Sequence, residues 1–333
     1  MMVMLKNMRK IFILVFMAGG LLAPPSVAQA KSLKVIATIK PLYSLVANVM
    51  GDTGQLDLMV SGGLNPHIYR LKPSNIRQIH NSDVVFYIDP NLEVFLKRIF
   101  KRKYNNFKAV PLAQAKGMHL IPYRTNKIWY QDAENPKETP KGSPQDLHIW
   151  LDPANARRMV RVIEETLSEL DPANSLTYIR NAQKTIARLY RMEEDIREQL
   201  RPFRQKTMIV YHDAFQYFEK AFSLKSVGAI ILKSDQTPSV KHIRALKRLA
   251  RTKNVTCVLG APGANPRIAT VVMSDTDAGF SVVDPLGLYL DKSPDLYFDM
   301  MHEMAQSIVD CQDDDSLSED LDALRNLPKK HNP

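Results

Sequence analysis

The sequence predicts an α/β protein with two parallel-sheet lobes joined by one long rigid helix. Short apolar runs alternate with helical patterns on both sides of a central segment, which is typical of parallel β–α–β units. In the central segment, apolar residues recur every third or fourth position over residues 176–200. This spacing indicates one continuous helix, roughly 40 Å long at 1.5 Å per residue.

Residues 1–30 resemble a secretory signal peptide. They begin with the basic stretch MMVMLKNMRK, continue with an apolar run at 11–23 that is short for a bilayer span, and end in Ala28-Gln29-Ala30. An uncleaved membrane anchor is the alternative. No cysteine follows that could carry a lipid, so we expect export by a cleavable signal peptide and a free protein in the periplasm.

The rest of the chain divides into four parts. We expect an N-terminal α/β lobe over 31–170, a connecting helix over 171–203, a C-terminal α/β lobe over 204–312 and a disordered polar tail over 313–333. The connecting helix would act as a strut between the lobes, and an ordinary packing helix within one domain is the alternative.

In the first lobe, short strands alternate with helices. The predicted strands cover residues 34–39, 56–60 and 83–88, and the predicted helices cover 42–50, 73–80 and 92–100. Residues 117–147 contain four prolines and little periodicity, so we expect a long surface loop there.

Two Asp-Pro pairs mark helix starts, because Asp is a good N-cap and Pro suits the first turn. Asp152-Pro153 starts one helix and Asp171-Pro172 starts the long one, which Pro202 ends. The expected apolar face of the long helix comprises Leu176, Ile179, Ala182, Ile186, Leu189, Met192, Ile196 and Leu200.

The second lobe repeats the alternation. The predicted strands cover residues 207–211, 226–231, 255–259 and 280–283, and the predicted helices cover 214–221, 238–252 with Thr237 as cap, and 294–310. Cys257 lies in a strand and Cys311 follows the last helix. An even count in an exported chain suggests one disulfide, worth roughly 3–4 kcal/mol, and two buried thiols are the alternative.

The charge of the chain points to no nucleic-acid partner. The formal net charge is +10, but the basic residues are scattered apart from runs at 97–108 and 241–253. The second run fits the solvated face of a helix, and an exported protein meets little nucleic acid. No close cysteine pair supports a zinc ribbon or a redox motif.

Four metal-competent residues follow strand-like runs or loops. They are His67, His148, His212 and Asp284. Ligands bind at the carboxyl ends of strands in open α/β sheets, and three imidazoles with one carboxylate suit tetrahedral zinc. Four protein ligands leave no position for water, which favours binding over catalysis. A metal-dependent hydrolase is the alternative, although the sequence has no HExxH motif.

Five motifs occur in the order found in one family. They are NPHIYRLKPS, DVVFYIDPNLEVFL, HIWLDP, VYHDAFQYF and VVDPLG, and together they span most of residues 34–311. The chain thereby resembles the solute-binding proteins of zinc and manganese ABC importers, the periplasmic zinc-uptake receptors in particular. The resemblance implies a metal site in the cleft between two lobes.

The resemblance also assigns roles to residues. It implies that His67, His148 and His212 are ligand histidines, that Asp284 is the acidic ligand, and that Cys257 and Cys311 form the disulfide of the zinc branch. We therefore expect a monomer, not an enzyme, that binds Zn²⁺ with high affinity and delivers it to an inner-membrane ABC permease. A manganese or iron receptor, or an adhesin with a structural metal, is the alternative.

The chain departs from the family pattern at several positions. Residues 117–147 contain only His119 where many zinc receptors carry a His-rich loop, and Pro66 stands where some have Glu. Gly260 replaces a usual acidic residue after its strand. His212 stands where the manganese branch tends to use a carboxylate, which favours zinc over manganese.

Overall fold

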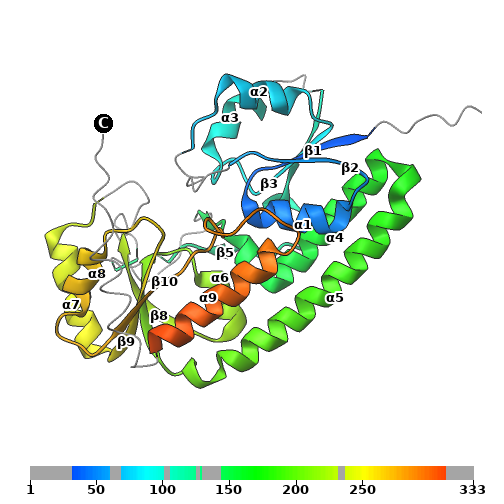
Figure 1. The fold of residues 1–333 in the computed structure, drawn as a ribbon. Helices are drawn as coiled ribbons and strands as arrows, with labels where there is room; N and C mark the ends of the chain where they lie inside the picture. Colours follow the sequence, from blue (N-terminus) through cyan, green and yellow to red (C-terminus); the bar gives the residue numbers. More distant parts are fainter. Residues whose placement is uncertain are drawn as a thin grey trace, which may run out of the picture. The chain divides into compact units, whose positions relative to one another are not determined.

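The computed structural model describes residues 32–60, 69–100, 106–124, 128–129, 144–231 and 237–312 (Figure 1). These residues belong to one compact unit that begins at Ser32. The predicted signal peptide, the predicted tail and the candidate ligand His67 lie outside the described residues. Within the described ranges, no helix is long and apolar enough to cross a membrane.

The first sheet has four parallel strands in the order β2-β1-β3-β4. The strands are β1 Leu33–Ala37, β2 Gly54–Leu58, β3 Val84–Tyr87 and β4 Lys108–Pro111. Helices α1 Lys40–Met50, α2 Pro73–His80 and α3 Lys97–Phe100 follow the first three strands, and the 3₁₀ turn η1 Val94–Leu96 leads into α3.

The second sheet is also parallel, in the order β10-β9-β7-β8. Its strands are β7 Thr207–His212, β8 Lys225–Ile231, β9 Val255–Gly260 and β10 Gly279–Val282. The helices that follow them are α6 Gln216–Phe222, α7 Val240–Thr252, α8 Pro266–Met273 and α9 Leu296–Gln312. The predicted α/β architecture with two parallel sheets is therefore confirmed.

The central strands are covered on both faces, which explains the continuous apolar run of β3, whose four residues are all buried. In β3, Val84 and Phe86 point into the largest hydrophobic core, while Val85 and Tyr87 point into a separate cluster. The largest core also includes Met208 and other residues of the second sheet. One continuous core therefore joins residues from both sheets.

The long helix α5 Ser175–Gln199 has 25 residues and follows α4 Pro153–Leu170. It contacts α4, α1 and α9, so it packs along elements that follow strands of both sheets (Figure 1). Its apolar face differs from the prediction: Leu176 is 74% exposed, and Ile179 is also exposed. Tyr178 takes the buried position, because its hydroxyl donates to Asp171 Oδ2 at 2.8 Å.

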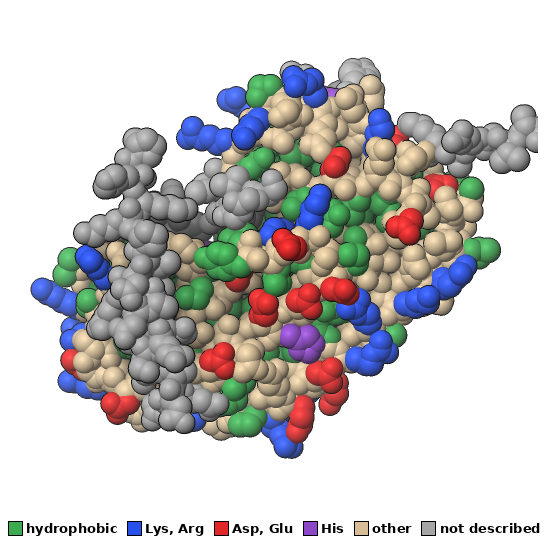
Figure 2. Space-filling view, viewed as in Figure 1, with side chains coloured by type: hydrophobic (Ala, Val, Ile, Leu, Met, Phe, Trp, Pro, Cys, Tyr) green, Lys and Arg blue, Asp and Glu red, His purple; other side chains and the backbone are tan. Residues whose placement is uncertain are grey.

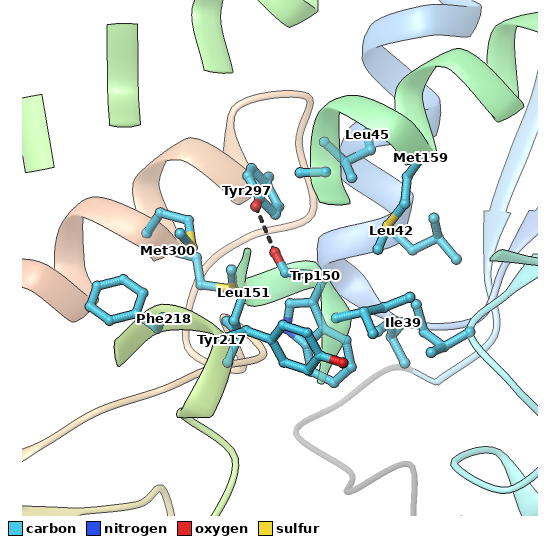
Figure 3. Close-up of a cluster of buried hydrophobic side chains, with 14 of the residues drawn as sticks. Ile39, Leu42, Leu45, Trp150, Leu151, Met159, Tyr217, Phe218, Tyr297 and Met300 are labelled. Carbon is cyan, nitrogen blue, oxygen red and sulfur yellow. Dashed lines mark hydrogen bonds between the residues drawn. The ribbon is translucent and has the colours of Figure 1, made fainter. Parts of the chain in front are cut away.

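Trp150 and Tyr297 lie at the centre of the largest core, beside Leu42 and Leu45 of α1 and Met159 of α4 (Figure 3). The Tyr297 hydroxyl donates to the carbonyl of Trp150 at 2.6 Å. Burial raises the pKa of Tyr297 well above its usual value, so this hydroxyl stays protonated and keeps donating. The bond ties α9 to the 3₁₀ turn η3 Ile149–Leu151.

Several local predictions were incomplete. The sequence analysis missed β4, which has only two apolar residues and ends in a proline that an edge strand tolerates. It also missed α8, because the Val, Ile and Thr residues of this helix favour strands. Ser239, not Thr237, caps α7 by accepting the His242 N–H at 3.2 Å. The proposed loop 117–147 contains the paired strands β5 Ile121–Pro122 and β6 Gln145–Asp146.

Candidate metal centre

Two of the candidate ligands leave the same edge of the second sheet. His212 is the last residue of β7, and Asp284 follows β10 by two residues. Parallel strands end at one edge, where open α/β sheets bind ligands. His148 differs, because it follows β6 of the small antiparallel pair and precedes η3.

The structure brings His148 and His212 together. Their ring centroids are 5.5 Å apart with an interplanar angle of 71°, and His148 is only 4% exposed. Two imidazoles on one tetrahedral zinc ion, with Zn–N bonds of about 2.0–2.1 Å, have centroids about 5 Å apart. The two rings therefore lie at a separation that suits a shared metal ion.

Asp146 orients His148, a role that the sequence analysis missed. Its Oδ1 accepts the His148 backbone N–H at 3.0 Å and lies 2.7 Å from His148 Nδ1. A carboxylate can only accept, so the proton sits on Nδ1 and leaves Nε2 with a lone pair for a metal ion. A carboxylate behind an imidazole also makes the ring a stronger ligand. The only signal in the sequence was an Asp two residues before the histidine.

Helix α6 holds Asp146 in place. Gln216 Nε2 donates to Asp146 Oδ2 at 3.1 Å, and the Tyr217 hydroxyl donates to the Asp146 carbonyl at 2.7 Å. Asp146 is fully buried, and Gln216 and His148 satisfy the two oxygens of a carboxylate that water does not reach. Helix α6 begins four residues after His212, and it holds Asp146, which in turn contacts His148. The short segment from His212 into α6 therefore positions both histidines.

A buried ion cluster lies next to His212. Arg124 Nη1 is 3.3 Å from Asp213 Oδ1, and Arg124 Nη2 is 2.5 Å from Glu219 Oε2. Burial raises the pKa of Asp213 to about 8; Arg124 counteracts this shift, and the carboxylates of Glu219 and Asp146 add to it. The guanidinium also stacks 3.9 Å from the centroid of the Trp129 ring. These contacts anchor described residues of the predicted surface loop to α6.

Asp284 organises the turn that follows β10. Its Oδ1 accepts the Leu286 N–H at 3.1 Å and its Oδ2 accepts the Tyr289 N–H at 3.3 Å. Trp150 Nε1 donates to the Pro285 carbonyl at 2.8 Å, and the Trp150 ring centroid lies 5.3 Å from that of His148. Through Trp150, the turn is therefore joined to the segment that carries His148.

The described residues do not complete a metal site. Among them, no three His, Cys, Asp or Glu side chains form a group that could hold a metal ion. His148 and His212 come together, Asp284 is not grouped with them, and His67 lies outside the described residues.

The surroundings of Asp284 are negative: Figure 2 shows acidic side chains over α9, where Asp299 and Glu303 are exposed. Burial, Asp299 and Asp284 raise the pKa of Glu303, which reflects this negative potential.

The structure accounts for two other features of the sequence. Cys257 in β9 and Cys311 in α9 form a disulfide, as the resemblance implied. At Gly260, a Cβ atom would lie 2.7 Å from Cζ of Phe280. The Phe280 ring thus occupies the space that a side chain at position 260 would need.

Comparisons with known proteins identify the family of the chain. The profile of the ZnuA family, described as zinc-uptake complex component A periplasmic, matches residues 35–311. The high-affinity zinc uptake system protein ZnuA of Brucella abortus (strain 2308) is 29% identical, covering 92% of this chain and 99% of the relative. The same protein of Paracoccus denitrificans (strain Pd 1222) is 27% identical, covering 85% of this chain and 93% of the relative.

A solved structure extends the agreement to the fold. The crystal structure of ZnuA superimposes with a TM-score of 0.70 at 24% identity, covering 85% of this chain and 100% of that chain. At this identity the match shows the fold alone. Since the family profile spans most of the sequence, the chain belongs to the ZnuA family of periplasmic zinc-uptake components.

Proposed function

We propose that this protein binds Zn²⁺ with high affinity in the periplasm and delivers it to an inner-membrane ABC permease. The observation that carries the proposal is the pair of histidine rings, His148 and His212, 5.5 Å apart, with the Asp146 carboxylate on Nδ1 of His148. The names of the relatives, high-affinity zinc uptake system proteins, support zinc as the cargo.

The proposed ligands are His67, His148, His212 and Asp284. Three imidazole nitrogens and one carboxylate favour zinc over manganese, since manganese prefers oxygen donors. A shell closed by four protein ligands holds no water for hydrolysis, so we assign the protein no catalytic step. Each Asp284 oxygen accepts one backbone N–H, from Leu286 or Tyr289, and keeps a second lone pair that can bind the metal ion.

Export and assembly form part of the proposal. Residues 1–30 act as a signal peptide cleaved after Ala30, and the exported protein works as a monomer with an N-terminal lobe, a connecting helix and a C-terminal lobe. Intact mass measurement of protein recovered from the periplasm is expected to give a chain that begins at Lys31. A chain that retains its first residues and fractionates with the membrane would contradict this part.

Zinc competition with a chromogenic chelator tests the binding site. The exported protein is expected to hold one zinc ion, and His148→Ala and His212→Ala are each expected to weaken binding at least 100-fold, since each removes a direct ligand. His302→Ala, on α9, is the control and should bind like the wild type. Manganese that displaces zinc, or zinc retained by both ligand variants, would overturn the proposal.

A further inference from the structure

One face of α1 holds the segment that begins with Asp284. Lys40, Ser44 and Asn48 are four residues apart, so their side chains follow one another along the same face of the helix. All three donate to backbone carbonyls between residues 287 and 294, about 250 positions away in the chain.

Lys40 makes three of these hydrogen bonds. Its ammonium donates to the carbonyls of Gly287 at 3.0 Å, Leu288 at 2.9 Å and Leu290 at 2.6 Å. An ammonium group has three N–H donors, so the turn uses all of them. Three carbonyl oxygens that converge on one point repel one another unless a positive charge lies between them. Lys40 therefore stabilises a backbone shape that would otherwise open.

The same turn is held from two other sides. The Asp284 carboxylate accepts N–H groups of Leu286 and Tyr289, and Trp150 Nε1 donates to the Pro285 carbonyl. If Asp284 binds a metal ion, its oxygens share their lone pairs between the ion and these N–H groups, which weakens the N–H contacts. The carbonyl contacts from Lys40 and Trp150 then remain to keep the turn in shape.

We propose that Lys40 is a positioning residue for the candidate ligand Asp284. By holding the carbonyls of residues 287–290, Lys40 keeps the turn folded and the Asp284 carboxylate in place to bind zinc. Lys40 lies in the first turn of α1 and does not bind the metal ion itself. It thus raises zinc affinity only through its effect on Asp284. This inference rests on the proposed function, because it takes Asp284 as a zinc ligand.

A double-mutant cycle on the exported protein tests this role. Lys40→Met keeps the length of the side chain and removes its charge and donors; we expect it to weaken zinc binding about 10-fold or more in competition with a chelator. In an Asp284→Asn background, the same change should alter affinity less than 2-fold. Lys40→Arg, which keeps the charge, should recover part of the affinity. Lys97→Met is the matched control, because it removes a lysine of α3 that donates to Asn91 at 3.0 Å in a solvent-exposed hydrogen bond, and it should change affinity less than 2-fold.

The outcomes separate the inference from the function on which it rests. Wild-type affinity in Lys40→Met, or an equal loss in both backgrounds, would overturn the role of Lys40, since a general loss of stability affects both backgrounds alike. Asp284→Asn that binds zinc like the wild type would overturn the ligand assignment and the inference together. Absence of zinc binding by the wild type would overturn the proposed function itself.

Discussion

Replacing Asp146 with Asn tests whether the buried carboxylate prepares His148 for metal binding. One carboxylate oxygen serves both His148 N–H groups, at 3.0 and 2.7 Å, and the other accepts from Gln216 at 3.1 Å. Asn can keep its oxygen toward His148 if Gln216 turns its amide and presents its own oxygen to the new NH₂ group. The substitution therefore removes one negative charge without opening a cavity.

The expected effect is on zinc affinity. Removal of a carboxylate behind a metal-binding imidazole typically weakens binding 10–100-fold, which corresponds to about 1.4–2.7 kcal/mol. We expect the zinc dissociation constant of Asp146→Asn to rise by this factor in a chelator competition at pH 7.5. Thermal unfolding without metal should differ little between the variant and the wild type.

Asp171→Asn provides the matched control. Asp171 is also buried and accepts two side-chain donors, from Tyr178 at 2.8 Å and Asn174 at 2.7 Å, but it contacts no histidine in the described part of the chain. Both donors use Asp171 Oδ2, which Asn can supply as its amide oxygen, so this variant is expected to stay folded and to keep its zinc affinity. Equal zinc affinities for Asp146→Asn and the wild type, with both folded, would refute the reasoning.

Three further predictions concern stability and shape. Burial raises the pKa of Glu93 to about 8, so the folded protein keeps a proton that the unfolded chain loses near pH 4.5; stability therefore falls as pH rises from about 4.5 to 8. In urea unfolding, the free energy of unfolding of Glu93→Gln should rise by roughly 3–5 kcal/mol relative to that of the wild type between pH 5 and pH 9. Free energies of unfolding that change with pH in the same way in both proteins would contradict this. The free energy of unfolding of the double variant Cys257→Ala/Cys311→Ala should be about 4 kcal/mol lower than that of the wild type, because the disulfide spans 54 residues. A decrease below about 1 kcal/mol would contradict this. Because α5 contacts α1, α4 and α9, small-angle scattering with and without zinc should give similar radii of gyration, and a large closure would contradict a rigid helix.

The sequence predicted the elements whose signals are local. His212 lies at the end of β7 as expected, and Asp152 caps α4 by accepting the Ala154 N–H at 2.8 Å. Both follow from short patterns: an apolar run that ends in a polar residue, and an Asp-Pro pair. The alternation of such patterns also sufficed to predict two parallel sheets.

Tertiary contacts determine the features that the sequence analysis missed. Tyr178 is buried in place of Leu176 because Asp171 and Thr53 offer hydrogen bonds to its hydroxyl, which periodicity cannot reveal. The contact of Lys40 with residues 287–290 joins positions that are far apart in the chain. The Phe280 ring fills the space beside Gly260 from the neighbouring strand β10, a contact that the local sequence around Gly260 does not reveal.

A crystal structure of the zinc-loaded exported protein, with anomalous data at the zinc edge, tests the central claim most directly. The account predicts one strong zinc peak about 2.0–2.1 Å from His148 Nε2, from one nitrogen each of His67 and His212, and from an Asp284 oxygen. It also predicts that His148 Nδ1 stays on Asp146. A zinc ion bound through His148 Nδ1, or bound away from His148 and His212, would contradict it.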